Sequence, residues 1–323
     1  MATFREIAGP PSGTLLLGIG DDAAVLRPLP GEDLVWTVDA LEEEVDFRRE
    51  WLRPEEVGAR AVAVTLSDLA GMAARPLAGL LVLGSAAPRP ARELGALFRG
   101  AAAAARRWGA AVAGGDLTRR RWGAGIAVTA LGAVPRAQGL RRSTAWPGDE
   151  IWVTGTPGLA ARGLRLLGSR GRRRAEAEAP EAFARYVRPT PRLDEAGWLA
   201  ARAGITAGID LSDGLALDLG RLCAASRLGA VLDEALVREA SAEPWDPDLR
   251  GALEGGDDYE LLLTAPPGAL GPLAAEFERA FRVPIRRVGE TVAEAGLRIG
   301  GRGGTRPLAR GGWDHLDPNG GRR

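Results

Sequence analysis

The sequence contains no lysine, and its 323 residues include one cysteine and one histidine. A single cysteine excludes a disulfide within the chain, and together with a single histidine it excludes a Cys/His zinc site and leaves little room for a Ser-His-Asp triad. The absence of lysine excludes a Walker P-loop as well as Schiff-base and pyridoxal chemistry. An enzyme built from this sequence must therefore rely on carboxylates, arginine, backbone amides and hard metal ions.

The chain also lacks net charge and long apolar runs. Its 42 basic and 42 acidic residues cancel, so no overall field attracts it to nucleic acid or to an anionic membrane. The longest apolar stretch, residues 77–87, is much shorter than the ~20 residues that span a bilayer. The N-terminus shows no cationic segment followed by an apolar one. These features predict a cytoplasmic protein that binds neither nucleic acid nor membrane.

Apolar runs of strand length alternate with longer segments of helical character, which predicts an α/β (α+β layered) fold. The expected strands are residues 34–38, 77–83, 110–113, 125–134 and 150–154. The expected helices are residues 54–73, 91–108, 193–203, 215–226 and 272–281. A turn at residues 146–149 separates a predicted domain 1–145 from a predicted domain 146–323. The Arg-rich and then Ala/Glu-rich segment 168–180 is predicted to be a solvated loop or mobile helix.

Six separated segments place aspartate beside glycine or at the end of an apolar run. They contain Asp21 and Asp22, Asp39, Asp68, Asp116, Asp210 and Asp213, and Asp257 and Asp258. Each aspartate alone is better explained as a turn residue or helix cap, but six similar segments in a chain without lysine favour a shared role. Converging carboxylates repel one another unless a cation lies among them, and Mg²⁺ prefers oxygen ligands and phosphates. The pattern therefore predicts metal-assisted phosphate chemistry.

Residues 18–23, Gly-Ile-Gly-Asp-Asp-Ala, also match the GxGxxG/A pattern of dinucleotide-binding folds. In such a fold the cofactor's pyrophosphate binds just after the glycines, where Asp21 and Asp22 would repel it. Pro28, Pro30 and Gly31 further leave no room for the helix that the fold requires. An oxidoreductase is therefore the weaker interpretation.

Taken in order, the acidic motifs resemble those of the thiamine-monophosphate kinase family. The motifs are GIGDDAAV at residues 18–25, VDAL at 38–41, LSDLAGM at 66–72, GGDLTR at 114–119, IDLSDGL at 209–215 and GGDDYEL at 255–261. The resemblance runs from about Gly18 to Trp313. It implies the two-domain fold of aminoimidazole ribonucleotide synthetase, with homodimers formed through the sheet of the N-terminal domain, and ATP-dependent phosphorylation of thiamine monophosphate with several Mg²⁺ ions.

The resemblance also implies roles for individual residues. The metal ligands it implies are Asp22, Thr37, Asp39, Asp68, Asp116, Asp210 and Asp213, with Asp39, Asp116 and Asp213 central and no residue acting as a catalytic acid or base. The implied nucleotide contacts are Gly115, Asp116, Arg142 and Ser212, and the implied substrate contacts are Asp46, Asp257 and Trp313. An arginine fork suits phosphate oxygens, and an aromatic face suits a cationic heterocycle.

Two positions depart from the family pattern. Asp46 stands before Phe47 where the family usually has histidine, which affects a substrate-phosphate contact, and Leu117 replaces a more usual threonine. Two other functions remain open at this point: an ATP-dependent enzyme of the same superfamily with a different acceptor, and a nucleotide sensor without catalytic activity. Selenophosphate synthetases generally carry a reactive cysteine or selenocysteine near the N-terminus, and the hydrogenase-maturation relatives carry one at the C-terminus. Cys223 instead lies inside a predicted helix.

Overall fold

The structure is a computed structural model that describes residues 6–7, 10, 13–17, 24–86, 91–301, 303–309 and 311–312. The chain divides into two compact units. The first comprises Met1–Leu69, Ala74–Gly139 and Val187–Leu193, and the second comprises Ala70–Ala73, Leu140–Tyr186 and Asp194–Arg323. Among the described residues, no helix is long and apolar enough to cross a membrane.

The first unit contains two sheets and two long helices. Its strands are β1 (Leu15–Leu17), β2 (Val25–Leu26), β3 (Glu32–Glu42), β4 (Arg75–Ala86), β5 (Ala111–Arg120) and β6 (Ala124–Pro135). Its helices are α2 (Pro54–Gly71), whose last two residues belong to the second unit, and α3 (Ala91–Arg107).

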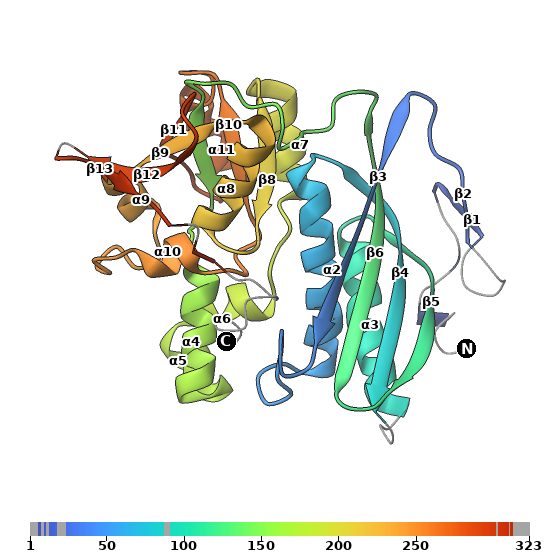
Figure 1. Cartoon of the computed structure of the whole chain (residues 1–323). Coiled ribbons are helices and arrows are strands. Elements are labelled where there is room, and N and C mark those ends of the chain that lie inside the picture. The colour runs from blue at the N-terminus through green and yellow to red at the C-terminus, as the bar shows by residue number, and fades with distance from the viewer. Residues whose placement is uncertain are drawn as a thin grey trace. The chain divides into compact units, whose positions relative to one another are not determined.

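A four-stranded sheet in the order β3-β6-β4-β5 forms the centre of the first unit, and α2 and α3 lie on one of its faces (Figure 1). Side chains alternate between the two faces of a strand. Leu41, Leu81 and Val128 are therefore buried beneath the helices, while Trp36 and Val38 are exposed on the opposite face. Most of this opposite face, the uncovered face, is therefore exposed within the described residues, although Leu15 of β1 packs against Ala78 of β4.

Two glycines allow α2 and α3 to approach closely. A Cβ atom at Gly58 of α2 would lie 1.9 Å from the carbonyl oxygen of Leu97, and one at Gly100 of α3 would lie 1.9 Å from that of Glu55. These contacts are reciprocal, because each glycine faces the backbone of the other helix. Only hydrogen at both positions permits this packing.

The second unit is built on a seven-stranded sheet in the order β13-β12-β9-β11-β7-β10-β8. The strands are β7 (Glu150–Thr154), β8 (Ala207–Leu211), β9 (Gly229–Asp233), β10 (Glu260–Ala265), β11 (Ile285–Val292), β12 (Gly296–Gly301) and β13 (Gly304–Pro307). The helices are α4 (Leu159–Arg170), α5 (Arg172–Glu178), α6 (Pro180–Val187), α7 (Leu193–Arg202), α8 (Leu215–Ser226), α9 (Glu234–Ala240), α10 (Arg250–Glu254) and α11 (Ala274–Phe281), with the 3-10 turn η1 (Gly271–Leu273).

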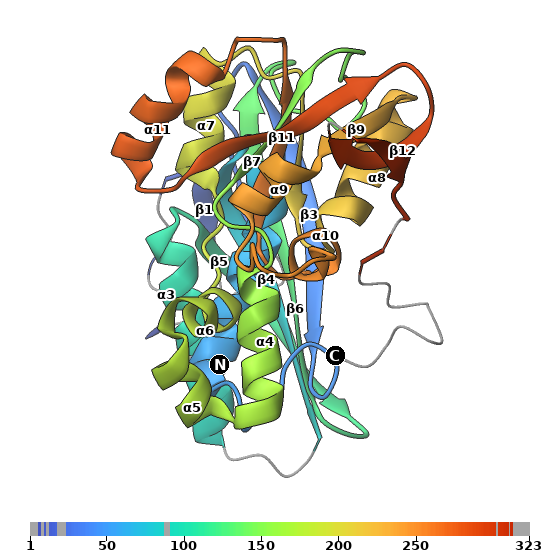
Figure 2. The ribbon, with the colours of Figure 1, turned by 90° about the vertical axis from the view of Figure 1, so that its left-hand side faces the viewer.

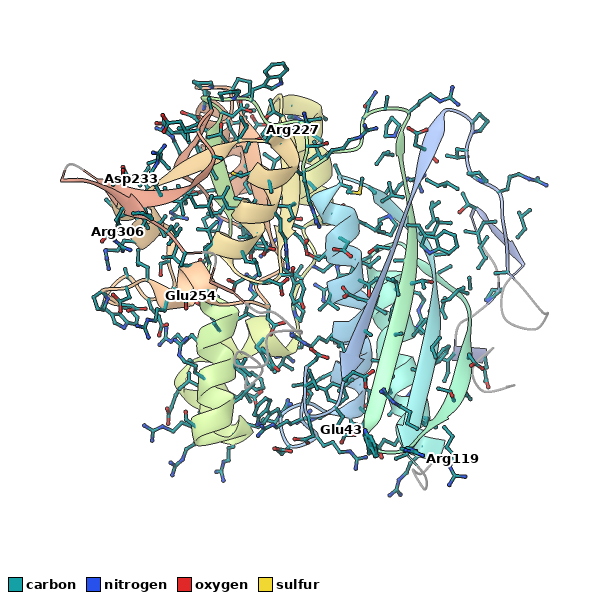
Figure 3. All side chains as sticks on the ribbon, viewed as in Figure 1. Glu43, Arg119, Arg227, Asp233, Glu254 and Arg306 are labelled. Atoms are coloured by element: carbon teal, nitrogen blue, oxygen red, sulfur yellow. The ribbon has the colours of Figure 1, made fainter. Side chains whose placement is uncertain are left out.

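Helices α8 and α9 cover one face of this sheet, and α7 and α11 lie on the other (Figure 2). Leu219 of α8 and Leu262 of β10 belong to the same buried cluster. On the other face, Trp198 of α7 packs against Phe277 of α11 with ring centroids 5.9 Å apart. Asp233 ends β9 and caps α9 by accepting the Ala235 N–H at 2.9 Å (Figure 3).

The structure confirms the predicted α/β class and all ten predicted elements, with several corrections. Strands β3 and β5 extend well past the predicted 34–38 and 110–113, because their hydrogen-bonded pairing continues to Glu42 and Arg120. Strands β8 to β13 were not predicted individually. The Arg-rich segment is mostly helical, and Ala175 of α5 is fully buried.

The close helix contact generates a stability prediction. Gly100→Ala should lower the free energy of unfolding by about 2 kcal/mol or more, because its Cβ would overlap backbone that cannot move without separating α2 from α3. Gly95→Ala in the same helix is the control: its Cβ would meet only the flexible end of Arg99 at 3.4 Å, and alanine favours helix by ~1 kcal/mol. Chemical denaturation measures both. Equal effects of the two substitutions would contradict the packing described.

Candidate active site

Thr37, Asp39 and Asp68 form the clearest group of predicted metal ligands in the first unit. Thr37 and Asp39 are two residues apart on β3 and therefore share its half-buried face. Asp68 lies near the end of α2, and its Oδ2 accepts a hydrogen bond from Thr37 Oγ1 at 2.5 Å. The fold thus brings together oxygen donors that lie 31 residues apart in the sequence.

Gly115 and Asp116 lie on β5, at the opposite edge of the same sheet. The register joins Asp39 to Val128, Val128 to Leu81 and Leu81 to Gly115, so Asp39 and Gly115 are three strand spacings apart, or about 14 Å. Asp116 pairs with Val82, whose side chain is on the uncovered face. A single sheet therefore does not present Asp39 and Asp116 to one ion.

Asp39 and Asp116 come after the predicted strands 34–38 and 110–113, and the structure corrects this placement. Each lies inside a longer strand, three or four residues before its last residue. Both strands are edges of the sheet, where polar side chains are tolerated more easily than in a central strand. The two carboxylates are held by regular strand backbone and not by loops.

Three predicted ligand-binding residues of the second unit lie at the end of β8 and in the loop after it. Asp210 is in the strand, and Ser212 and Asp213 are in the loop. Asp210 is buried, and Asp213 is partly exposed. The backbone N–H groups of Ser212 and Asp213 donate to Asp218 Oδ2 at 3.0 and 2.9 Å. Asp218 lies in the first turn of α8 and is completely buried. Its carboxylate therefore fixes the loop that carries two predicted ligand-binding residues.

Asp257 lies beside this loop. Its backbone N–H donates to the carbonyl of Ser212 at 2.8 Å, and the N–H of Tyr259 donates to that of Leu211 at 2.7 Å. The hydroxyl of Tyr259 donates to Asp257 Oδ1 at 3.1 Å. Asp257 and Tyr259 have φ values of 71° and 50°, a left-handed conformation that is costly outside glycine and is concentrated at functional sites. The fold thus accepts backbone strain to hold Asp257 next to Ser212.

Gly312 connects this cluster with the end of the described chain. A Cβ at Gly312 would lie 2.5 Å from the carbonyl oxygen of Asp213 and 2.7 Å from Leu217 Cβ. Trp313, the next residue and a predicted substrate contact, lies outside the described residues, as does the predicted metal ligand Asp22. The segment that leads to Trp313 nevertheless passes directly against Asp213.

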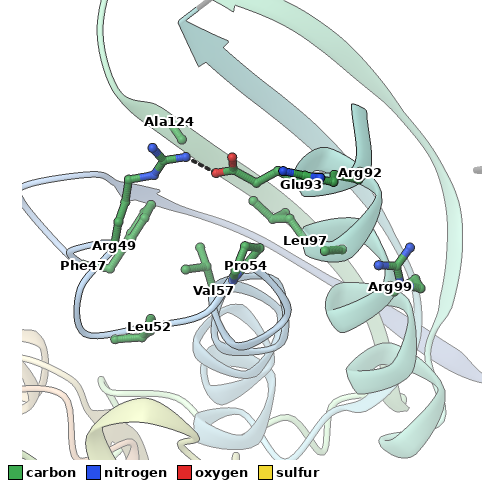
Figure 4. Close-up of a pocket in the computed structure, with 11 residues that line it drawn as sticks. Phe47, Arg49, Leu52, Pro54, Val57, Arg92, Glu93, Leu97, Arg99 and Ala124 are labelled. Carbon is green, nitrogen blue, oxygen red and sulfur yellow. Dashed lines mark hydrogen bonds and ion pairs between the residues drawn. The ribbon is translucent and has the colours of Figure 1, made fainter. Parts of the chain in front are cut away.

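Asp46 is buried, and its Oδ2 accepts the N–H of Glu42 at 2.8 Å. The following residue, Phe47, lines a pocket of about 510 Å³ between the start of α2 and α3 (Figure 4). Apolar side chains form much of its wall, and Arg49 pairs with Glu93 at its edge. Asp46 is not among the described residues that line this pocket. The carboxylate of Asp46 therefore stabilises the turn after β3.

Arg142 is exposed, and its carbonyl oxygen accepts a hydrogen bond from Ser226 Oγ at 2.7 Å. Its guanidinium is thus accessible to an anion. Within the described part of the chain, no three aspartate, glutamate, cysteine or histidine side chains come close enough together to hold a metal ion. The predicted oxygen donors are present in small groups within each unit, namely Thr37 with Asp68, and Asp210 with Ser212, Asp213 and Asp257.

A buried acidic network, to which the sequence analysis assigned no separate role, supports Asp257. Asp258 accepts the N–H groups of Gly158 and Ala160, at 2.6 and 2.9 Å, at the start of α4. Glu260 accepts the Thr154 hydroxyl at 2.7 Å and pairs with Arg185. Burial raises the pKa of Asp258 to about 7, against the lowering effect of the two amide donors. These contacts anchor the strained segment 257–259 at Asp258 and directly after it at Glu260.

The sequence analysis also did not predict that Asp218 and Arg221 contribute to the site. Burial raises the pKa of Asp218 to about 6. A sequence signal for Asp218 did exist, because an acidic residue in the first turn of a helix often accepts free N–H groups at the helix start. No comparable local signal distinguishes Arg221 from the other arginines, since its partners are defined only by the folded loop.

Comparison with known proteins adds to this geometry. The family models for the AIR synthase related protein match residues 20–134 with its N-terminal domain and residues 147–301 with its C-terminal domain. The thiamine-monophosphate kinase of Synechococcus elongatus is 39% identical over 77% of this chain and 77% of its own length. The chain belongs to the thiamine-monophosphate kinase family.

Solved structures of the family agree with this fold. The crystal structure of the thiamine-monophosphate kinase of Stenotrophomonas maltophilia K279a is 37% identical, has a TM-score of 0.78 and is matched over 88% of this chain and 91% of its own. AaThiL complexed with AMPPCP and TMP is 26% identical, has a TM-score of 0.75 and is matched over 92% of both chains. The two-domain α/β fold predicted from the resemblance is confirmed.

The raised pKa of Asp258 predicts a pH-dependent contribution to stability. Because the unfolded chain releases this proton near pH 4 and the folded chain near pH 7, the free energy of unfolding should fall by roughly 1 kcal/mol per pH unit across that window and level off above it. Asp258→Asn should remove this slope between pH 6 and 7 and reduce it between pH 4 and 6, where Asp218 contributes a slope of the same sign, as measured by denaturant unfolding between pH 4 and 8. Asp248→Asn, at an exposed carboxylate, controls for the lost charge. A slope that persists between pH 6 and 7 in Asp258→Asn would show that another group causes it.

Proposed function

We propose that this chain transfers the γ-phosphoryl group of ATP to thiamine monophosphate, forming thiamine diphosphate and ADP. The observation that supports this most strongly is the likeness, over most of both chains, to thiamine-monophosphate kinases, one of which is solved with AMPPCP and TMP. The grouped oxygen donors and the absence of lysine and of a catalytic histidine pair agree with this chemistry. The cytoplasmic location stays a prediction from the sequence.

The reaction needs no general base. A phosphate monoester has a second pKa of ~6, so the acceptor is already a dianion at neutral pH. The chain must instead hold two polyanions in line against their mutual repulsion. In this proposal, Ser212 and the exposed guanidinium of Arg142 bind and orient the nucleotide. Asp257, fixed beside Ser212, orients the thiamine end of the acceptor.

Magnesium fits the donors that the structure groups together, since these are oxygen atoms without sulfur or imidazole. Thr37, Asp39 and Asp68 are proposed to hold magnesium in the first unit, and Asp210 and Asp213 are proposed to hold it in the second. Bound magnesium would supply positive charge that offsets the repulsion between the phosphates. The rigid strands and helix that carry these donors fix where that charge lies.

A single assay tests the function. Purified protein with ATP and Mg²⁺ should form ADP and thiamine diphosphate only when thiamine monophosphate is present. Asp39→Asn should lower kcat by ~100-fold or more while the fold is kept, because a neutral amide would hold magnesium more weakly than a carboxylate does. Asp33→Asn, the same change at an exposed position of β3, is the matched control. ADP formation that does not depend on thiamine monophosphate would indicate a different acceptor. ATP binding without ADP formation would indicate a sensor.

We further propose a homodimer formed through the uncovered face of the four-stranded sheet. Leu34, Trp36 and Val38 of β3 are 49%, 73% and 62% exposed there, and Leu80 and Val82 of β4 continue the same face. A contiguous apolar surface of this kind is typical of an interface. A second copy of the chain is its proposed occupant, because a two-fold contact lets one apolar sheet cover another like it.

Trp36→Glu should convert this dimer to a folded monomer, because it places a charge on the apolar face at its most exposed large side chain. Sedimentation or light scattering at micromolar concentration measures the mass, and circular dichroism checks the fold. Trp245→Glu, which changes a tryptophan of the second unit that is 68% exposed, should leave the mass unchanged. A monomeric wild-type protein, or a Trp36→Glu variant that is still dimeric, would contradict this interface.

A further inference from the structure

One nitrogen of the Arg221 guanidinium donates hydrogen bonds to two carboxylates of the second unit. Its Nη1 donates to Asp213 Oδ2 at 2.5 Å and to Asp218 Oδ1 at 2.6 Å. Arg221 and Asp218 are three residues apart on α8 and so share a face of the helix, while Asp213 lies in the loop just before it. The guanidinium therefore lies between a residue that shapes the loop and a residue proposed to bind metal.

The two carboxylates differ in their freedom to release Arg221. Asp218 is completely buried, and its other oxygen already holds two backbone N–H groups. Losing its cation would leave a buried charge poorly compensated, which is costly. The Asp213 side chain is 21% exposed and that of Arg221 is 40% exposed, so water reaches the bond between them. Ion pairs accessible to water contribute little net stability and are exchanged easily.

Arg221 also occupies an oxygen atom that magnesium would need. Asp213 Oδ2 is the atom that receives the guanidinium, so a divalent cation on that oxygen would be repelled by a positive group bonded to the same atom. A cation close to a metal site also lowers the affinity of the site for the metal through direct repulsion. Metal binding at Asp213 Oδ2 therefore competes with the Arg221–Asp213 ion pair.

We propose that Arg221 is the resident counter-ion of Asp213, which it neutralises in the metal-free chain and must release when magnesium binds. Arg221 remains attached to Asp218 during this exchange, so the loop keeps its shape. It is thus a positioning residue that sets the magnesium concentration at which the site fills. The inference rests on the proposed function, because that function assigns a metal to Asp213.

Direct metal binding tests the exchange. Mn²⁺, used alone as a paramagnetic substitute for Mg²⁺, is titrated into full-length protein and the free ion is followed by electron paramagnetic resonance. Arg221→Gln should bind Mn²⁺ about three- to tenfold more tightly than the wild type at the site that Asp213→Asn removes. Arg221→Lys, which keeps the positive charge, should return the affinity toward the wild-type value.

Arg298→Gln is the matched control. Arg298 lies in the same unit, its side chain is 36% exposed, and it pairs with Glu294 far along the chain from the proposed ligands. This variant should bind Mn²⁺ as the wild type does. A folded Arg221→Gln that binds Mn²⁺ no more tightly than the wild type would overturn the proposal.

A second measurement does not depend on how well the variant folds. In a crystal of wild-type protein grown with Mg²⁺ and AMPPCP, Arg221 should have left Asp213 and kept its contact with Asp218. A metal ion on Asp213 with Arg221 still bonded to the same oxygen would overturn the proposal. If wild-type protein made no thiamine diphosphate while Arg221→Gln still tightened Mn²⁺ binding, only the proposed function would fail. Normal kinase activity with unchanged Mn²⁺ affinity would refute only the counter-ion role.

Discussion

Carboxylates held close together on rigid backbone require a compensating positive charge, and this requirement governs much of the second unit. Arg221 compensates Asp213 and Asp218, Arg185 compensates Glu260, and the start of α4 compensates Asp258. In the first unit a hydroxyl takes part instead, since Thr37 donates to Asp68. The chain thus supplies this compensation from its own arginines, hydroxyls and helix ends. The partly exposed Asp213 is a position where an external cation could replace an internal one.

The sequence predicted those elements whose pattern is strong and local. Helix α8 begins and ends at the predicted residues, and α2 begins at the predicted Pro54, because apolar spacing and turn residues mark these ends. The six later strands were not predicted individually. Some, like β8, are short and buried on both faces, and others, like β12 and β13, are rich in glycine, so neither kind shows a clear alternation. Their pairing depends on partners that lie far away in the chain.

The candidate site shows the same division between local and long-range information. The sequence marked Asp68, Asp213 and Asp257 by their neighbours, and the fold places Asp68 against Thr37 and Asp257 against the loop before α8. It could not mark Arg221, whose importance comes only from the two oxygens it meets. Nor could it show that Asp39 and Asp116 stand at opposite edges of one sheet, because strand order is a property of the whole unit.

The glycine contact between α2 and α3 also determines how this protein can vary in length. Gly58 fixes where α2 lies against α3, and Asp68 follows ten residues later on the same helix, a distance of about 15 Å at 1.5 Å per residue. Inserting or deleting one residue between them would turn Asp68 by about 100° about the helix axis and carry its carboxylate away from Thr37. The number of residues in this stretch is therefore constrained as strictly as their identity. Helix α2 sets a fixed distance between the glycine contact and Asp68.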